Sequence, residues 1–271
     1  MLGFSSSTGV DFLPDDTARA WVADGLREVS AHLSRHWGEV VHRPRVVTET
    51  SISKPQNLDE LFELICGVQS EIGQHDVEFS LVELTDDKTP SVPRGFKPLG
   101  SPEGQLLHTF HKDGEYVVLA TPQIFKLTPV VFSSVARELG RIAIHIADRD
   151  GVALRRAPKD EQDLADREGD AELAAITLGL GVWVANGAYV YESACCGGGC
   201  GIDLKSLRAG LSMPEACFAL AVDGQQKGLS RRLFTKHLES NQTAALKRSW
   251  GYVKKQPALT APPQSAALSA G

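Results

Sequence analysis

The stretch "SSVARELGRIAIHIA" (residues 133–147) decides how the chain is expected to fold. Its apolar residues recur every three or four positions, at Val135, Leu139, Ile142 and Ile146. This spacing predicts an amphipathic helix over about residues 128–148, with its apolar stripe buried. On such a helix Arg137 and Arg141, at i and i+4, project from one face, and Glu138 lies between them in sequence. The helix therefore places two cations and one acid beside a buried stripe.

Length and composition are those of an ordinary soluble globular protein. The 271 residues are 42% hydrophobic and 23% charged, and a chain of this length can bury a sizeable core. The net charge of −6, without a stripe of Lys and Arg, argues against a nucleic-acid-binding protein. Five cysteines, an odd number, do not indicate a disulfide framework, and no secretory signal is evident at the start. We therefore expect a cytoplasmic protein.

One segment tests the expectation of a soluble protein. "LAAITLGLGVWVANGAYVY" (residues 173–191) has 19 uncharged residues, about the length of a membrane span. It contains three glycines, and acids rather than Lys or Arg lie at its two ends, at Glu172 and Glu192. A buried central helix of a large domain has the same pattern, and we favour that interpretation. A membrane-anchored protein that spans at residues 173–191 is an alternative.

The pattern along the chain predicts the α+β class. Helical spacing indicates helices over residues 14–37, 57–73, 128–148, 173–191, 213–226 and 236–254. Residues 77–84 alternate as a strand does, and residues 105–121 are typical of a hairpin that turns at Asp113-Gly114. A Pro/Gly-rich loop is expected over residues 89–104. These elements give a small N-terminal mixed sheet with a hairpin packed on the helix of residues 128–148, followed by an all-helical lobe.

We expect one domain between two tails. The tails, rich in Ser, Ala and Pro, are a flexible one at residues 1–12 and a disordered one at 256–271. The domain of residues 13–255 comprises an α/β lobe (13–150), a charged loop (151–170) and a helical lobe (171–255).

The order of elements and three motifs resemble a bacterial group of zincin-type proteins, mostly uncharacterised and related to the H-E-x-x-H metallopeptidases. With histidine in place of Arg137 and Arg141, the central stretch would read H-E-L-G-H, the motif in which two histidines bind zinc and the Glu activates a metal-bound water. The following helix, "AELAAITLGLGVWVANGAYVYE" (residues 171–192), is similar to the group's next helix. The positions that match are Leu178, Gly179, Gly181, Val182, Ala185 and Asn186. "GLSMPEACFALAV" (residues 210–222) resembles a third region, so the resemblance covers about residues 15–255.

The resemblance implies a zincin-like fold whose metal site has been altered. The group's acidic third ligand maps to Glu172, or to Asp170 if the register slips. Arginine stays protonated and has no lone pair to donate, so neither Arg137 nor Arg141 can bind a metal. We therefore predict that zinc is lost, that Glu138 is a vestigial catalytic residue, and that the guanidinium groups pair with Glu172 or Asp170 instead, with Glu138 as a second acceptor.

Two other groups of residues are candidate metal ligands. His145 continues the row of Arg137 and Arg141, and with Glu172 and the cysteines it could form a relocated metal site. The motif "CCGGGCG" contains three cysteines that could bind zinc together with Cys217 or a histidine: Cys195, Cys196 and Cys200. Its C-C-x3-C spacing differs from the paired C-x2-C of zinc knuckles, which favours free thiols. His108 and His111, three apart on a strand, point to opposite faces and cannot form a pair.

The expected function is that of a pseudoenzyme. A zincin-like protein without its metal would be a catalytically inactive binding or scaffold module, whose partner is another protein or a small anionic ligand. Nucleic acid and membrane are not expected as partners. The alternatives are a metal-dependent hydrolase or peptidase with a relocated metal site and the membrane-anchored protein described above.

Overall fold

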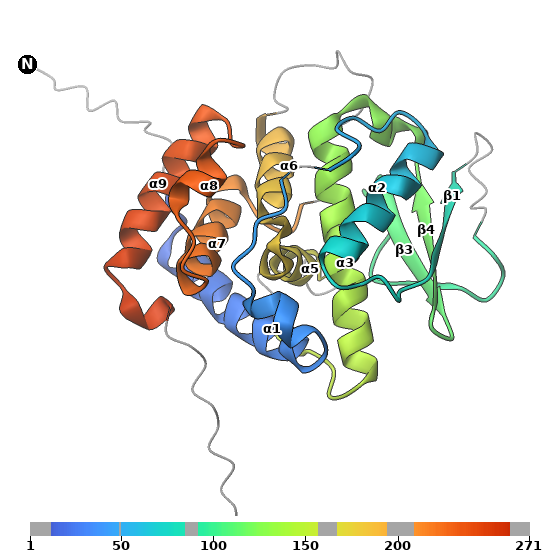
Figure 1. The fold of residues 1–271 in the computed structure, drawn as a ribbon, viewed down its shortest axis with the longest axis horizontal. Coiled ribbons are helices and arrows are strands. Elements are labelled where there is room, and N and C mark those ends of the chain that lie inside the picture. Colours follow the sequence, from blue (N-terminus) through green and yellow to red (C-terminus); the bar gives the residue numbers. More distant parts are fainter. Residues whose placement is uncertain (1–11, 49, 85–91, 157–166, 194–208, 261–271) are drawn as a thin grey trace, which may run out of the picture.

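The computed structural model describes residues 12–48, 50–84, 92–156, 167–193 and 209–260. Within them the chain is α+β, as predicted, and is mostly helical (Figure 1). The longer helices are α1 (Asp16–His42), α2 (Leu58–Glu71), α3 (Thr128–Arg149), α5 (Glu168–Ala175), α6 (Gly181–Ser193), α7 (Met213–Gln226) and α9 (Ser240–Lys254). Short helical elements complete them: α8 (Arg231–Thr235), the 3₁₀ turns at Pro122–Lys126 and Pro257–Leu259, and a π turn at Ile176–Leu180.

The sheet has four strands in the order β1-β4-β3-β2. Their bounds are β1 (Phe79–Glu83), β2 (Lys97–Pro98), β3 (Leu107–Lys112) and β4 (Glu115–Ala120). β1 pairs with β4 in parallel and the other pairs are antiparallel, so the sheet is mixed, as predicted. β3 and β4 form the predicted hairpin, in which Asp113 (φ 51°) and Gly114 (φ 97°) adopt the left-handed conformations of a tight two-residue turn.

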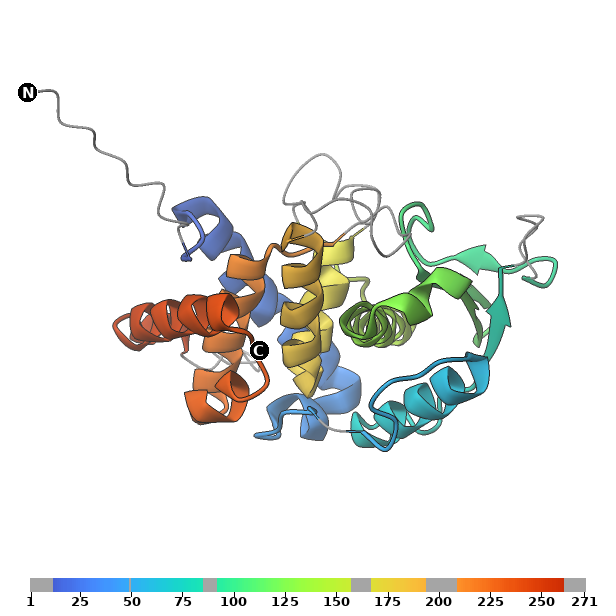
Figure 2. The same ribbon diagram turned by 90° about the horizontal axis from the view of Figure 1, so that it is seen from above.

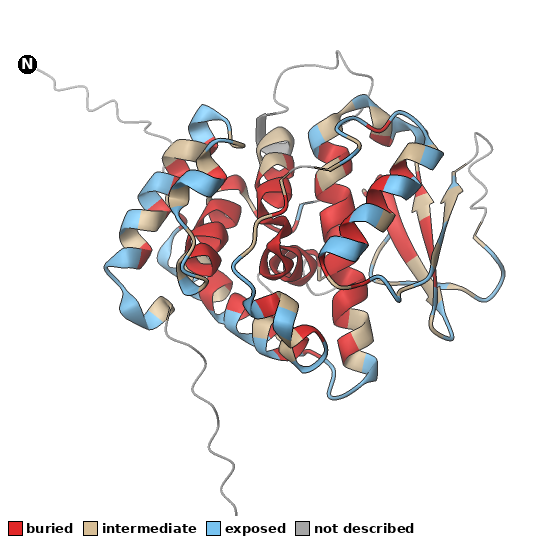
Figure 3. Ribbon diagram, in the orientation of Figure 1, coloured by how far each residue is buried: buried red, intermediate tan, exposed pale blue. Residues whose placement is uncertain are grey.

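Helix α3 lies between the sheet and the helices of the C-terminal half. Figure 2 shows it nearly end-on, with the sheet and α2 on one side and α5 and α6 on the other. Burial follows the same arrangement, because α3 and the α5–α6 segment are buried over most of their length (Figure 3). The predicted stripe of α3 contributes Val135, Leu139 and Ile142 to the interior.

The long apolar segment forms a central helix of the protein. Glu168–Val190 is the one helical run in the described ranges that is long and apolar enough to cross a membrane, and 83% of its most apolar window is buried. This burial is typical of the core helix of a soluble protein, as we predicted for residues 173–191. The run is interrupted by the π turn, in which Gly179 has a φ of 94°.

Several predicted boundaries differ from the observed ones. Residues 168–170, assigned to the charged loop, open helix α5, and α1 continues to His42, beyond the predicted helix end at residue 37. β2 lies inside the predicted loop of residues 89–104, and α8 is separate from α9. Pro257–Leu259, assigned to the disordered tail that begins at residue 256, form a 3₁₀ turn. Residues 1–11 and 261–271 lie outside the described part of the chain.

Candidate functional site

Helices α3 and α5 cross with their backbones in contact at Gly140. A Cβ atom at this position would overlap the carbonyl oxygen of Ala171 and lie 2.8 Å from the nitrogen of Ala175, so the close crossing requires glycine. Gly140 lies between Arg137 and Arg141 in sequence. The crossing therefore brings both arginine side chains against the first turns of α5.

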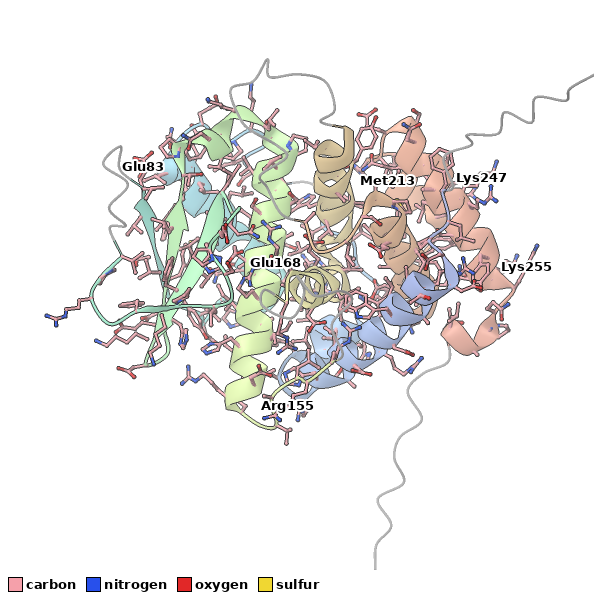
Figure 4. The ribbon with its side chains drawn as sticks, turned by 180° about the vertical axis from the view of Figure 1, so that it is seen from behind. Glu83, Arg155, Glu168, Met213, Lys247 and Lys255 are labelled. Atoms are coloured by element: carbon pink, nitrogen blue, oxygen red, sulfur yellow. The ribbon has the colours of Figure 1, made fainter. Side chains whose placement is uncertain are left out.

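Two arginines and three glutamates meet at this crossing, and we call Arg137, Glu138, Arg141, Glu168 and Glu172 the Arg–Glu cluster. Arg137 Nε lies 3.1 Å from Glu168 Oε2, and Arg137 Nη1 lies 3.4 Å from Glu172 Oε1. Arg141 Nη2 donates to both oxygens of Glu168, at 2.7 and 2.8 Å. The Glu168 carboxylate thus lies between the two guanidinium groups, where α3 and α5 meet (Figure 4).

Further hydrogen bonds connect the Arg–Glu cluster to the sheet and to the segment before α7. Glu138 Oε2 accepts from the backbone N–H of Thr109 on β3, at 2.8 Å, and lies 3.3 Å from Arg141 Nε. Glu172 accepts from the backbone N–H groups of Gly210, at 3.2 Å, and Leu211, at 2.7 Å. Arg137 also donates to Gln105, and Arg141 donates to the carbonyl of Leu99. The cluster therefore holds four separate parts of the chain together.

The Arg–Glu cluster is buried, so its charges interact in a medium of low dielectric constant. The exposed fractions of the five side chains range from 2% for Arg137 to 7% for Arg141. Burial raises the pKa of Glu172 to about 7, although Arg137 and the two backbone amides lower it. Burial alone would lower the pKa of Arg141, but Glu138 and Glu168 raise it above its ordinary value. The cluster has two formal positive charges and three negative ones, so a third buried carboxylate charge is only partly compensated, in line with the raised pKa of Glu172.

The predicted ion pairs are present in part. The pairing of Arg137 with Glu172 is confirmed, and so is Glu138 as a second acceptor, through Arg141. The alternative partner Asp170 is wrong for these arginines, because its carboxylate binds Arg156 and Arg167. Glu168, the acid that contacts both guanidinium groups, was not predicted. It is four residues before Glu172, the same spacing as between the arginines, and this matching i, i+4 pattern was the signal that could have found it.

The residues present do not fit a zinc ion at the crossing. The two positions that carry histidine in the H-E-x-x-H motif carry guanidinium groups, which have no lone pair, and these groups lie against the carboxylates that would otherwise be available. Over the described ranges, no three His, Cys, Asp or Glu side chains gather as metal ligands.

The other candidate metal ligands do not come together within the described residues. His145 Nδ1 lies 3.0 Å from the hydroxyl of Tyr116, and the His145 ring lies 4.3 Å from that of His111. Burial, with His111 and Arg149, lowers the pKa of His145 to about 4. Cys217 is buried, with its Sγ 3.6 Å from the carbonyl of Gln242. Cys195, Cys196 and Cys200 lie outside the described residues.

A pocket of about 280 Å³ borders the Arg–Glu cluster. Among the described residues, its charged lining comprises two arginines and two aspartates: Arg141, Arg167, Asp148 and Asp170. Arg141 already binds Glu138, Glu168 and the carbonyl of Leu99, so its charge is largely compensated before any ligand arrives. The pocket can hold a small molecule, and the formal charges of its described lining residues are balanced.

No protein-family model, curated protein or solved structure matches this chain.

Proposed function

We propose that this chain is a zincin-like pseudoenzyme, a catalytically inactive protein that acts in the cytoplasm as a binding or scaffold module. The observation that carries the proposal is the Arg–Glu cluster. Its arginines occupy the two histidine positions of an H-E-x-x-H frame, and its glutamates accept from those arginines. Two guanidinium groups replace the +2 charge that the metal of a zincin contributes at the same crossing.

The surroundings of Glu138 support the absence of hydrolysis. A general base must be able to reach a water molecule and take its proton. The carboxylate of Glu138 is 3% exposed, accepts from the backbone of β3 and lies beside the guanidinium of Arg141. Because the carboxylate oxygens of Glu138 are occupied by these contacts, we assign a structural role to the residue that would activate water in a zincin.

The partner of the module is proposed to be another protein or a small anionic ligand. The pocket beside the cluster is one place for such a ligand, because Arg167 at its edge keeps a side chain that is 40% exposed. A bidentate contact to a carboxylate or phosphate would require Arg167 to exchange Asp170 for the ligand.

Metal analysis tests the proposal. The purified wild-type chain, after exposure to zinc and removal of free zinc by dialysis, should retain far less than one zinc ion per molecule. It should also not cleave generic fluorogenic peptides. The double variant Arg137→His/Arg141→His should bind about one zinc ion, and adding Glu172→Gln or Glu168→Gln should identify the third ligand. Retention of about one zinc by the wild-type chain, lost on Glu138→Gln or Glu172→Gln, would overturn the proposal. Failure of the folded double variant to bind zinc would contradict the zincin-like part of it.

A further inference from the structure

The C-terminal helices concentrate positive charge in an otherwise acidic protein. Residues 227–255 contain eight Lys or Arg residues and a single acid, Glu239, whereas the whole chain has a net charge of −6. Four of these cations lie on helix α9 or at its C-cap and are exposed: Lys247, Arg248, Lys254 and Lys255. Their spacing of i and i+7 places them on one face of the helix. Figure 4 shows Lys247 and Lys255 along the outer edge of α9.

A pocket of about 580 Å³ lies along this face of α9, and we call it the α9 pocket. Its described lining includes three of the cations, Lys247, Arg248 and Lys255, and no acidic side chain. None of the three makes an ion pair within the described ranges. The apolar part of the lining comes from α9 and from the segment before α1: Phe12, Leu13, Ala244 and Tyr252. The pocket therefore combines an apolar wall with positive charge.

Gly251 keeps the helical side of the α9 pocket open. It lies three residues after Arg248 and four before Lys255, so it shares their face of the helix. A Cβ atom at this position would meet no atom within 4 Å. Glycine is less favourable than alanine inside a helix, so this position gives up helix stability and leaves space between the cations.

The wall of the pocket is positioned by α1. The guanidinium carbon of Arg19 lies 4.6 Å from the centroid of the Tyr252 ring, a cation–π contact. The acids at the start of α1 are already engaged, because Asp15 accepts from the N–H of Ala18 at 2.8 Å and Asp16 binds Arg19. These acids therefore do not serve as partners of the lysines on α9.

The outer face of helix α2 has the complementary character. Phe62 is 42% exposed, and its ring lies against that of Phe79, with centroids 5.0 Å apart. Asp59 and Glu63 are exposed as well. They are four residues apart, with Phe62 three residues after Asp59, so the three side chains share a face. This face presents an aromatic ring between two carboxylates.

The two faces belong to opposite ends of the molecule. Helix α9 lies toward one end of the long axis and α2 toward the other (Figures 1 and 2), so the two faces cannot meet within one chain. A contact between two different faces of two copies is heterologous and continues into a ring or an open chain. A phosphate-bearing surface, of nucleic acid or lipid, would use the cations but not the apolar wall, and the net negative charge of the protein would oppose it.

We propose that the α9 pocket binds helix α2 of a second copy of this chain. Phe62 of one copy packs against the apolar wall of the other, and Asp59 and Glu63 pair with the cations of α9. A contact of one helix face with one pocket belongs to the weak class of interfaces, below about 1,200 Å², and pairing of exposed charges is sensitive to salt. This inference goes beyond the proposed function, because it depends neither on the zincin-like resemblance nor on the loss of zinc.

Sedimentation velocity of the full chain tests the inference. In about 50 mM salt the sedimentation coefficient should rise with protein concentration up to about 0.5 mM, and about 0.5 M salt should remove most of the rise. The charge variants Lys247→Gln/Lys255→Gln and Asp59→Asn/Glu63→Gln should each weaken self-association about tenfold. An equimolar mixture of the two should form mainly a one-to-one dimer, because only one complementary pair of faces remains. Gly251→Leu fills the pocket without changing the charge, favours the helix and should abolish self-association.

The matched control is Arg94→Gln/Lys97→Gln, which removes the same charge from two exposed residues at β2 and should leave self-association unchanged. The inference is overturned if the wild-type chain stays monomeric, if the control weakens association as much as Lys247→Gln/Lys255→Gln, or if Gly251→Leu associates like the wild type. Binding of a DNA duplex or of phosphatidylserine vesicles by a chain that stays monomeric, lost in Lys247→Gln/Lys255→Gln, would assign the cations to phosphate groups and also overturn it. None of these measurements depends on zinc content, so this inference and the proposed function can fail separately.

Discussion

Replacing Arg137 by methionine tests whether the Arg–Glu cluster stabilises the α3–α5 crossing. Methionine fills a similar volume but cannot pair with Glu168 or Glu172, which lie 3.1 and 3.4 Å from the guanidinium group. Because Arg137 is 2% exposed, water cannot replace it as a partner. Removing one partner of a buried ion pair costs about 3–5 kcal/mol, since the remaining charge stays buried and uncompensated.

This loss is measurable by thermal and urea unfolding. At about 2–4 °C per kcal/mol, the unfolding midpoint of Arg137→Met should fall by roughly 6–20 °C. The loss should be smaller at pH 6 than at pH 8, because Glu172, whose pKa is raised to about 7, can take up a proton when its cation is missing. Arg155→Met is the control: Arg155 is exposed, and its replacement should change stability by less than about 0.5 kcal/mol. An unfolding midpoint for Arg137→Met within about 2 °C of the wild type would refute the reasoning.

Three further predictions concern pH, packing and helix capping. The pKa of Glu172 is raised to about 7 in the folded protein, against 4.5 when unfolded. Its contribution to stability is therefore fully present below about pH 4.5 and is lost as the pH rises through 7. In urea titrations from pH 5 to 8, the free energy of unfolding should decline by up to about 3 kcal/mol, and Glu172→Gln should lack this decline. Gly140→Ala should lower the free energy of unfolding by at least about 3 kcal/mol or prevent folding, because its methyl group meets backbone atoms of α5. The control Gly67→Ala, whose methyl group has nothing within 4 Å, should stabilise the protein by up to about 1 kcal/mol in the same urea unfolding experiments. Asn57→Ala should cost about 1 kcal/mol in urea unfolding, because the Asn57 side chain accepts from the first turn of α2 at 2.9 Å.

Local patterns in the sequence predicted the elements whose cause is local. The hairpin follows from Asp113-Gly114 between two apolar runs, and α2 begins where the helix of residues 57–73 was predicted to begin, with Asn57 as its N-cap. β2 could not be predicted in this way. It has only two residues, one of them Pro98, and it exists because it pairs with β3, more than ten residues later in the chain.

The start of α5 and the site residue Glu168 were not predicted from the sequence for the same reason. Glu168 and Asp170 end a run of charges that is typical of a solvated loop. Their burial depends on cations from distant positions: Arg137 and Arg141 for Glu168, and Arg156 for Asp170. Burial of a carboxylate requires such partners, and the identity of a partner that far away is a tertiary property.

The crossing at Gly140 explains why the charges of the Arg–Glu cluster must compensate one another. On α3 the arginines are four residues apart, and on α5 Glu168 and Glu172 are four residues apart, so one face of each helix presents two charges to the other. With the backbones in contact at Gly140, neither helix can rotate or withdraw to expose these side chains to water. Whatever occupies positions 137 and 141 must therefore compensate buried acids on α5, as a metal with its ligands or two arginines can do. Replacing either arginine alone by an uncharged residue, as in Arg137→Met, leaves a buried acid without its cation, so we expect a well-tolerated replacement to be one that brings an equivalent positive charge.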